Sequence, residues 1–62
     1  MEKLLTIEEL ANMLNVPKVY IYRLNYENRG PKIIRLGNRT IRYRLADVES
    51  WLLMQAEEDK AA

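Results

Sequence analysis

The basic residues of this chain gather in one stretch, residues 17–44. That range holds eight Lys and Arg side chains against a single acidic residue, Glu27, and its formal charge is +7. The flanking ranges are acidic, with formal charges of −2 over 1–16 and −4 over 45–62, so the whole chain has a charge of only +1. Clustered cations mixed with tyrosines are typical of a surface that binds a polyanion, with nucleic acid as the first candidate. A merely solvated charged surface is the alternative.

The chain is poor in the residue types that catalysis and metal binding require. It contains no His and no Cys, which excludes metal sites built on these ligands and ordinary His acid–base chemistry. Adjacent carboxylates such as Glu8 and Glu9 point about 100° apart on a helix and do not converge on one atom. With only Gly30 and Gly37 present, no glycine-rich loop can cradle a phosphate. We therefore expect no enzyme, no catalytic residue, no metal, no cofactor and no small-molecule ligand.

The length of 62 residues predicts one small domain with a thin core. We expect this domain to span residues 1–56 and to be followed by an acidic, disordered tail over 57–62. No apolar run approaches the ~20 residues of a membrane span, and no signal-peptide pattern opens the chain. The expectation is a cytoplasmic protein without a membrane partner.

Two helices and a short turn are predicted in the first half of the chain. Thr6 and Glu9 have the spacing of a capping box, so a helix is expected over residues 7–14. Asn15 tolerates the left-handed conformation that ends helices, and Pro17 suits the start of the next one. Val16 would fill the corner between them. A turn of this length between two helices is typical of a helix-turn-helix.

The second helix, over about residues 17–25, has two different faces. Tyr20, Ile21 and Leu24 share one face, which should pack on the first helix. The opposite face combines cations with apolar and aromatic side chains, and we predict that it contacts DNA through Lys18, Val19, Tyr22 and Arg23. Tyr20 and Tyr26 remain open between a core role and a contact role.

A basic hairpin and a third helix are predicted in the second half. Residues 33–36 and 39–43 are β-prone runs around Gly37-Asn38. Alternation places two pairs of apolar residues on one face, Ile34 and Leu36 with Ile41 and Tyr43. It directs Arg35, Arg42 and Arg44 outward, with Arg39 at the tip.

A helix from about residue 45 should close the core through Leu45, Val48, Trp51 and Leu52. The expected fold is mainly α with a small β-hairpin, a winged helix-turn-helix.

Several segments, in order, resemble the small winged-helix domains of phage and plasmid excisionases, to which AlpA-type regulators and MerR-type DNA-binding domains are related. The similar segments are residues 5–11, 14–16, 21–24, 30–32, 35–39, 42–44 and 47–52. The sequence departs from the family pattern at Pro17, where Ser or Thr is usual, and at Val19 and Tyr20. The bases that this chain reads therefore do not carry over from the family.

The resemblance implies a sequence-specific protein that binds double-stranded DNA, with the wing contacts made by Arg35, Asn38, Arg39 and Arg42. It implies an excisionase, or recombination directionality factor, that bends attachment-site DNA, self-associates on it and assists an integrase. An AlpA- or MerR-like transcription regulator with the same binding mode is the close alternative. A protein-interaction module is a different class, in which the basic face serves only solubility. RNA binding is disfavoured because the chain lacks the aromatic-rich sheet surface of single-strand readers.

Overall fold

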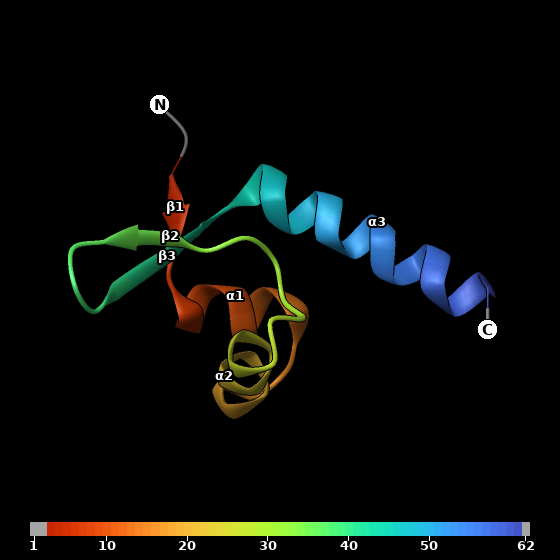
Figure 1. Ribbon diagram of the computed structural model, residues 1–62, viewed down its shortest axis with the longest axis horizontal. Helices are drawn as coiled ribbons and strands as arrows, with labels where there is room; N and C mark the ends of the chain where they lie inside the picture. Colours follow the sequence, from red (N-terminus) through yellow and green to blue (C-terminus); the bar gives the residue numbers. More distant parts are fainter. Residues whose placement is uncertain (1–2, 62) are drawn as a thin grey trace.

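The computed structural model describes residues 3–61 of the chain, and the side chains of residues 3–57. It contains three helices and a three-stranded antiparallel sheet with the strand order β1-β3-β2 (Figure 1). The helices are α1 (Ile7–Leu14), α2 (Lys18–Tyr26) and α3 (Leu45–Ala61), and the strands are β1 (Leu4–Leu5), β2 (Ile34–Leu36) and β3 (Thr40–Arg44). This is a small winged helix-turn-helix, and the predicted fold class is confirmed.

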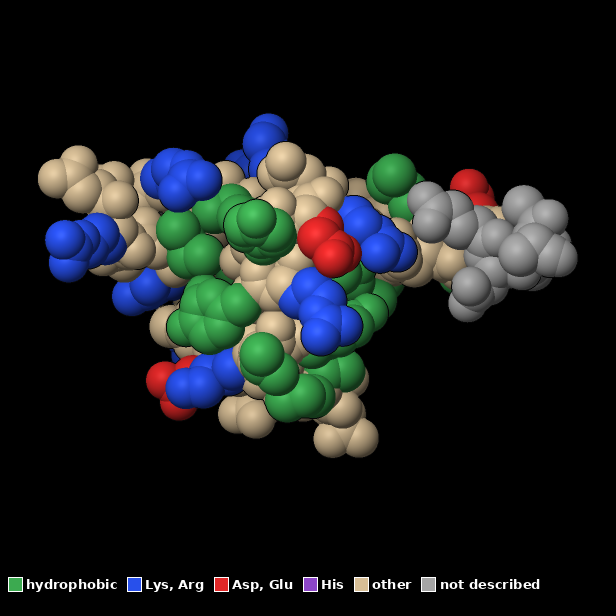
Figure 2. Space-filling view, turned by 60° about the horizontal axis from the view of Figure 1, so that its bottom comes forward, with side chains coloured by type: hydrophobic (Ala, Val, Ile, Leu, Met, Phe, Trp, Pro, Cys, Tyr) green, Lys and Arg blue, Asp and Glu red, His purple; other side chains and the backbone are tan. Residues whose placement is uncertain are grey.

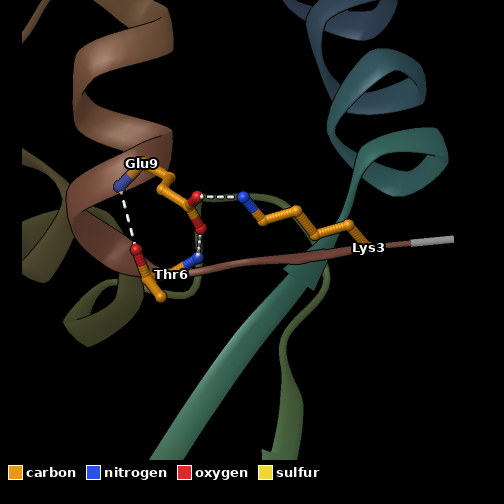
Figure 3. Close-up of polar contacts among 3 residues, drawn as sticks. All are labelled: Lys3, Thr6 and Glu9. Atoms are coloured by element: carbon orange, nitrogen blue, oxygen red, sulfur yellow. Dashed lines mark hydrogen bonds and ion pairs between the residues drawn. The ribbon is translucent and has the colours of Figure 1, made fainter.

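The start of α1 is fixed by the predicted capping box. The Glu9 backbone N–H donates to Thr6 Oγ1 at 3.0 Å, and the Thr6 backbone N–H donates to Glu9 Oε1 at 2.9 Å (Figure 3). Lys3 Nζ lies 2.8 Å from the other oxygen, Glu9 Oε2. The ion pair and the hydrogen bonds lower the pKa of Glu9 below its ordinary value of 4.5. Two backbone N–H groups that a helix start leaves without partners are thereby satisfied.

An asparagine in the left-handed conformation follows both α1 and α2, directly after Leu14 in α1 and after the cap residue Glu27 in α2. Asn15 has a φ of 58°, as predicted, and Asn28 has a φ of 56°. Beyond each asparagine, a backbone N–H reaches back five residues, from Val16 to the Ala11 carbonyl and from Arg29 to the Leu24 carbonyl. This is the Schellman pattern, which satisfies carbonyls at a helix end.

Gly30 has a different role from the one that its position after α2 suggests. The positive φ lies at Asn28, and Gly37 is the glycine with a positive φ. At Gly30 a Cβ would lie 3.2 Å from Leu24 Cβ, which is tighter than ordinary van der Waals contact. Gly30 therefore allows the chain leaving α2 to pass close to the helix.

The core lies between α1, α2, β3 and the first turns of α3. Its buried hydrophobic residues are Leu10, Ala11, Ile21, Leu24, Tyr43 and Val48. Val16 packs against this core, as predicted. The expectation for α3 was too broad, because Leu45 and Leu52 remain 39% and 41% exposed. Trp51 is half-buried and its Nε1–H donates to the Arg29 carbonyl at 2.8 Å, which joins α3 to the loop after α2.

The hairpin forms, but its predicted register is wrong by one residue. Leu36 pairs with Thr40 and Ile34 pairs with Arg42, so the loop comprises the three residues 37–39 and not Gly37-Asn38 alone. Residues directly opposite in an antiparallel pair share a face, and a one-residue slip exchanges the faces of a strand. Ile34 therefore lies on the face of Arg42, and Arg35 lies on the face of Ile41. The prediction that Arg35 and Arg42 share the outer face is wrong for this reason.

Two further features were not foreseen. The β1 strand pairs with β3, which places Leu5 opposite Tyr43 and makes β3 the central strand. A two-residue strand is too short to show an alternating pattern. In addition, the backbone of α3 continues past Met54 to Ala61. Of the expected tail, residues 57–61 lie within this helix span, and residue 62 lies outside the described residues.

Candidate nucleic-acid interface

The outward face of α2 carries the four residues predicted to contact DNA. Lys18, Val19, Tyr22 and Arg23 are all exposed, while Ile21 and Leu24 on the opposite face are buried. Within the part of the chain that the structure describes, Lys18 and Arg23 have no ion-pair partner. Two cations and two large apolar side chains are thus available to a ligand on one helix face.

The two tyrosines left open by the sequence both lie outside the core. Tyr26 is 90% exposed and Tyr20 is 42% exposed. Tyr26 follows Tyr22 by four residues, so the two rings lie on the same side of α2. The core tyrosine is instead Tyr43, whose hydroxyl donates to Asn25 Oδ1 at 2.9 Å. Burial raises the pKa of Tyr43, so its hydroxyl stays protonated at neutral pH.

The start of α2 has no side-chain cap. Pro17 occupies the cap position in an extended conformation and makes no side-chain hydrogen bond to the helix. The Tyr20 N–H donates to the Pro17 carbonyl at 3.0 Å, so the first-turn N–H groups left to water or to an external acceptor are those of Lys18 and Val19. A helix N-terminus with free N–H groups favours anions, including DNA phosphates, through the helix dipole.

A groove joins the start of α2 to the wing. It measures about 350 Å³, and it brings Lys18 and Tyr22 together with Arg39 and Arg42. Its lining residues are Thr6, Ile7, Glu8, Lys18, Tyr22, Arg39, Thr40, Ile41 and Arg42. Two predicted helix contacts and two predicted wing contacts thus face one hollow. Arg42 is half-buried there, and its Nη1–H donates to the Ile41 carbonyl at 2.8 Å, which limits its reach.

The other predicted wing residues lie elsewhere. Asn38 is exposed in the loop 37–39, beside Arg39 at the hairpin tip. Arg35 does not line the groove of Lys18 and Tyr22. It lines a second groove of about 340 Å³, where Lys32 is the other cation. The predicted wing set is therefore divided between two grooves and the tip.

Sequence reasoning did not place Glu8 or Thr40 in the first groove. Their positions depend on how closely the start of α1 approaches β3. The two segments are more than 30 residues apart in the chain, so no local pattern signals this contact.

Cations dominate the hairpin end of the molecule. On the face drawn in Figure 2, Lys and Arg side chains gather at that end, and others surround the apolar patches at the centre. Two arginines of the basic stretch form ion pairs with carboxylates. Arg29 Nη1 lies 3.4 Å from Glu27 Oε1, and Arg44 Nε lies 3.1 Å from Asp47 Oδ2. Ion pairs this exposed contribute little to the stability of the fold. The basic residues of this surface are therefore better explained by binding of a negatively charged ligand than by a structural role.

Two features that would indicate other kinds of site are absent from the described residues. Among residues 3–57, no group of three or more acidic side chains is placed to hold a metal ion. In the described helices, none is long and apolar enough to cross a membrane.

A helix-turn-helix with an exposed cationic second helix and a basic wing defines a DNA-binding domain. The model of a helix-turn-helix domain family matches residues 4–56, which is most of the chain. The chain therefore belongs to this family of small DNA-binding domains. No curated protein and no solved structure matches the chain significantly.

Proposed function

We propose that this chain recognises specific sequences in double-stranded DNA by placing α2 in the major groove and the loop 37–39 against the adjacent minor groove. The observation that carries the proposal is the shared groove of Lys18, Tyr22, Arg39 and Arg42, because it joins the recognition helix and the wing in one continuous surface. Lys18 and Arg23 donate to guanine or phosphate, and Val19 suits contact with a thymine methyl group. Asn38 and Arg39 serve the wing contact from the hairpin tip.

The test is a gel-shift titration with duplex from the native locus beside random duplex. We expect Arg23→Ala and Arg39→Ala each to weaken binding to the native duplex. Lys32→Ala is the matched control, because it removes an exposed cation that does not line the groove of Lys18 and Tyr22. Equal loss in all three variants would indicate a general charge effect and would contradict a defined reading face.

Salt dependence gives an independent measure of the same contact. If about six phosphates are neutralised, log K should fall with log[salt] at a slope near −5. Arg39→Ala should reduce this slope by about one unit if the wing contacts a phosphate. An affinity that does not change with salt would contradict DNA binding through this surface.

At the level of process, we propose an excisionase that binds adjacent sites at an attachment site and assists an integrase. The segments that resemble excisionases support this assignment. Physical size supports it too, because one small domain specifies few base pairs and needs neighbouring copies for selectivity. DNase footprinting on attachment-site DNA should show an extended protected block, and addition of the protein should favour excision by the integrase. A single short footprint at a promoter would favour the AlpA-like regulator instead.

A further inference from the structure

One acidic side chain lies in the groove that we propose to bind DNA. Glu8 lines this groove together with Lys18, Arg39 and Arg42, and it is the one carboxylate among the described residues that form the lining. Glu8 and Lys18 also line a second hollow of about 200 Å³, formed by α1 and the turn before α2. The Glu8 carboxylate therefore lies close to the start of the recognition helix, within a surface that is otherwise basic.

The neighbouring residue Glu9 shows that the start of α1 does not need Glu8 for its cap. Glu9 completes the capping box with Thr6 and binds Lys3 (Figure 3). Glu8 points about 100° away from it around the helix. It is exposed, and within the described part of the chain it forms no side-chain hydrogen bond and no ion pair. The Glu8 carboxylate is thus available to a ligand in the groove.

The chemistry of a carboxylate limits what Glu8 can contact on DNA. An ionised carboxylate accepts hydrogen bonds and donates none. Phosphate oxygens also only accept and are negatively charged, so Glu8 repels any phosphate that Lys18 or Arg39 attracts into the groove. The donors that a duplex presents in its major groove are the exocyclic amines of cytosine and adenine. A duplex that places such an amine at Glu8 gains a hydrogen bond, and any other duplex meets only the repulsion.

We propose that Glu8 is a specificity-determining residue, which accepts a hydrogen bond from a cytosine or adenine amine at the native site and repels the DNA backbone elsewhere. Specificity is a difference between two affinities, and a repulsive group raises it by weakening the wrong complexes. The cations of the groove attract every duplex, whereas Glu8 distinguishes one duplex from another. This inference rests on the proposed function, because Glu8 acts only where α2 and the wing contact DNA.

The first test measures the affinities of Glu8→Gln for native and random duplex by gel-shift titration. This change removes the charge and keeps the shape of the side chain. Binding to random duplex should tighten about threefold, the effect of removing one unit charge about 6 Å from a phosphate in water. Binding to native duplex should not tighten, because the lost hydrogen bond offsets the lost repulsion. The ratio of native to random affinity should therefore fall at least about threefold.

The matched control is Glu57→Gln. It removes the same charge from an exposed position on α3 that does not line the groove. The ratio of native to random affinity should be that of the wild-type protein. An equal tightening on both duplexes in Glu8→Gln and in Glu57→Gln would show a general charge effect and would overturn the inference.

The second test locates the base that Glu8 contacts. Each base pair of the footprinted native site is substituted in turn, and the affinities of the wild-type protein and of Glu8→Ala are compared. At one position the wild-type protein should prefer cytosine or adenine at least about fivefold, the lower end of discrimination by a good base contact. Glu8→Ala should lose the preference at that position alone. Arg23→Ala should change the preference at a different position or weaken binding uniformly.

The outcomes separate this inference from the proposed function. Native-site selectivity that Glu8→Gln and Glu8→Ala leave unchanged would overturn the role of Glu8 and leave the DNA-binding surface intact. Equal binding of the wild-type protein to native and random duplex would overturn both. A merely structural role predicts a lower thermal unfolding temperature in Glu8→Gln with equal weakening on both duplexes, and that result would also overturn the inference.

Discussion

The helices α1 and α2 are nearly equal in length and end in the same way, but they begin differently. α1 starts with a complete capping box and an additional ion pair to Lys3. α2 starts at Pro17, without any side-chain cap. The two helices are neighbours in one motif. Comparing them therefore distinguishes the contacts that stabilise a helix from the features that leave its surface free to bind a ligand.

The contrast suggests a division of roles. The start of α1 is stabilised by contacts within a few residues of its own sequence, and its buried Leu10 and Ala11 pack in the core. α2 depends on distant partners, because its apolar face is buried by other elements and Asn25 accepts a hydrogen bond from Tyr43. Its first turn and its outer face remain open to a ligand. Because contacts on its buried face hold α2 in position, its opposite face can be exposed to a ligand.

The largest expected effect separates the two faces of α2. Ile21→Ala removes a fully buried side chain and should lower the free energy of unfolding by about 2–5 kcal/mol, as large-to-small core changes do. Tyr22→Ala, one residue later on the exposed face, should change it by no more than about 0.5 kcal/mol. Urea unfolding measures both values, and comparable losses would show that the outer face is structural. Tyr22→Ala should nevertheless weaken DNA binding.

The next largest effect compares the two helix starts. Thr6→Ala removes the capping oxygen of α1 and should lower the free energy of unfolding by about 1 kcal/mol. Pro17→Ala removes no side-chain hydrogen bond and should change it by less than about 0.5 kcal/mol. The two proteins are compared by thermal or urea unfolding. A cost for Pro17→Ala as large as that for Thr6→Ala would contradict the contrast.

The hydrogen bond from Tyr43 to Asn25 of α2 gives a third prediction. Its expected effect on the free energy of unfolding is similar to that of Thr6→Ala or smaller. Tyr43→Phe keeps the buried ring but leaves Asn25 Oδ1 without its donor, and should cost about 0.5–1.5 kcal/mol. Because the ring remains, the core should not repack. Hydrogen exchange should show faster opening of amides in α2 than in α1. Uniform acceleration across both helices would argue against a specific fastening of α2.

The smallest effect is a pH dependence confined to the start of α1. The folded pKa of Glu9 is lowered by Lys3 and Thr6, so its contribution to stability is present above the unfolded pKa, near 4.5. That contribution is lost as pH falls from about 4.5 through the folded pKa. Glu9→Gln should flatten this part of the acid unfolding curve, by less than the change caused by Thr6→Ala. An unchanged acid limb would show that the exposed ion pair contributes nothing measurable.

Local features were predictable because their causes are local. The capping box of Thr6 and Glu9 and the left-handed Asn15 involve residues within a few positions of one another, and the structure confirms both. The bounds of α1 and the apolar face of α2 follow from the spacing of apolar residues in the same way. The exposed positions of Lys18, Val19, Tyr22 and Arg23 agree with this face assignment.

The features that the sequence did not determine depend on contacts between distant segments. The register of β3 is set jointly by β1, β2 and the burial of Tyr43, and a loop of two or three residues around Gly37 is locally acceptable either way. That single residue of register decides that Arg42 lies in the groove of Lys18 and Tyr22 while Arg35 lies in another. The sequence by itself thus determined where the three helices lie, both ends of α1 and the basic stretch. Only the tertiary structure decided which cations share a surface, because the faces of a strand are fixed by its partners.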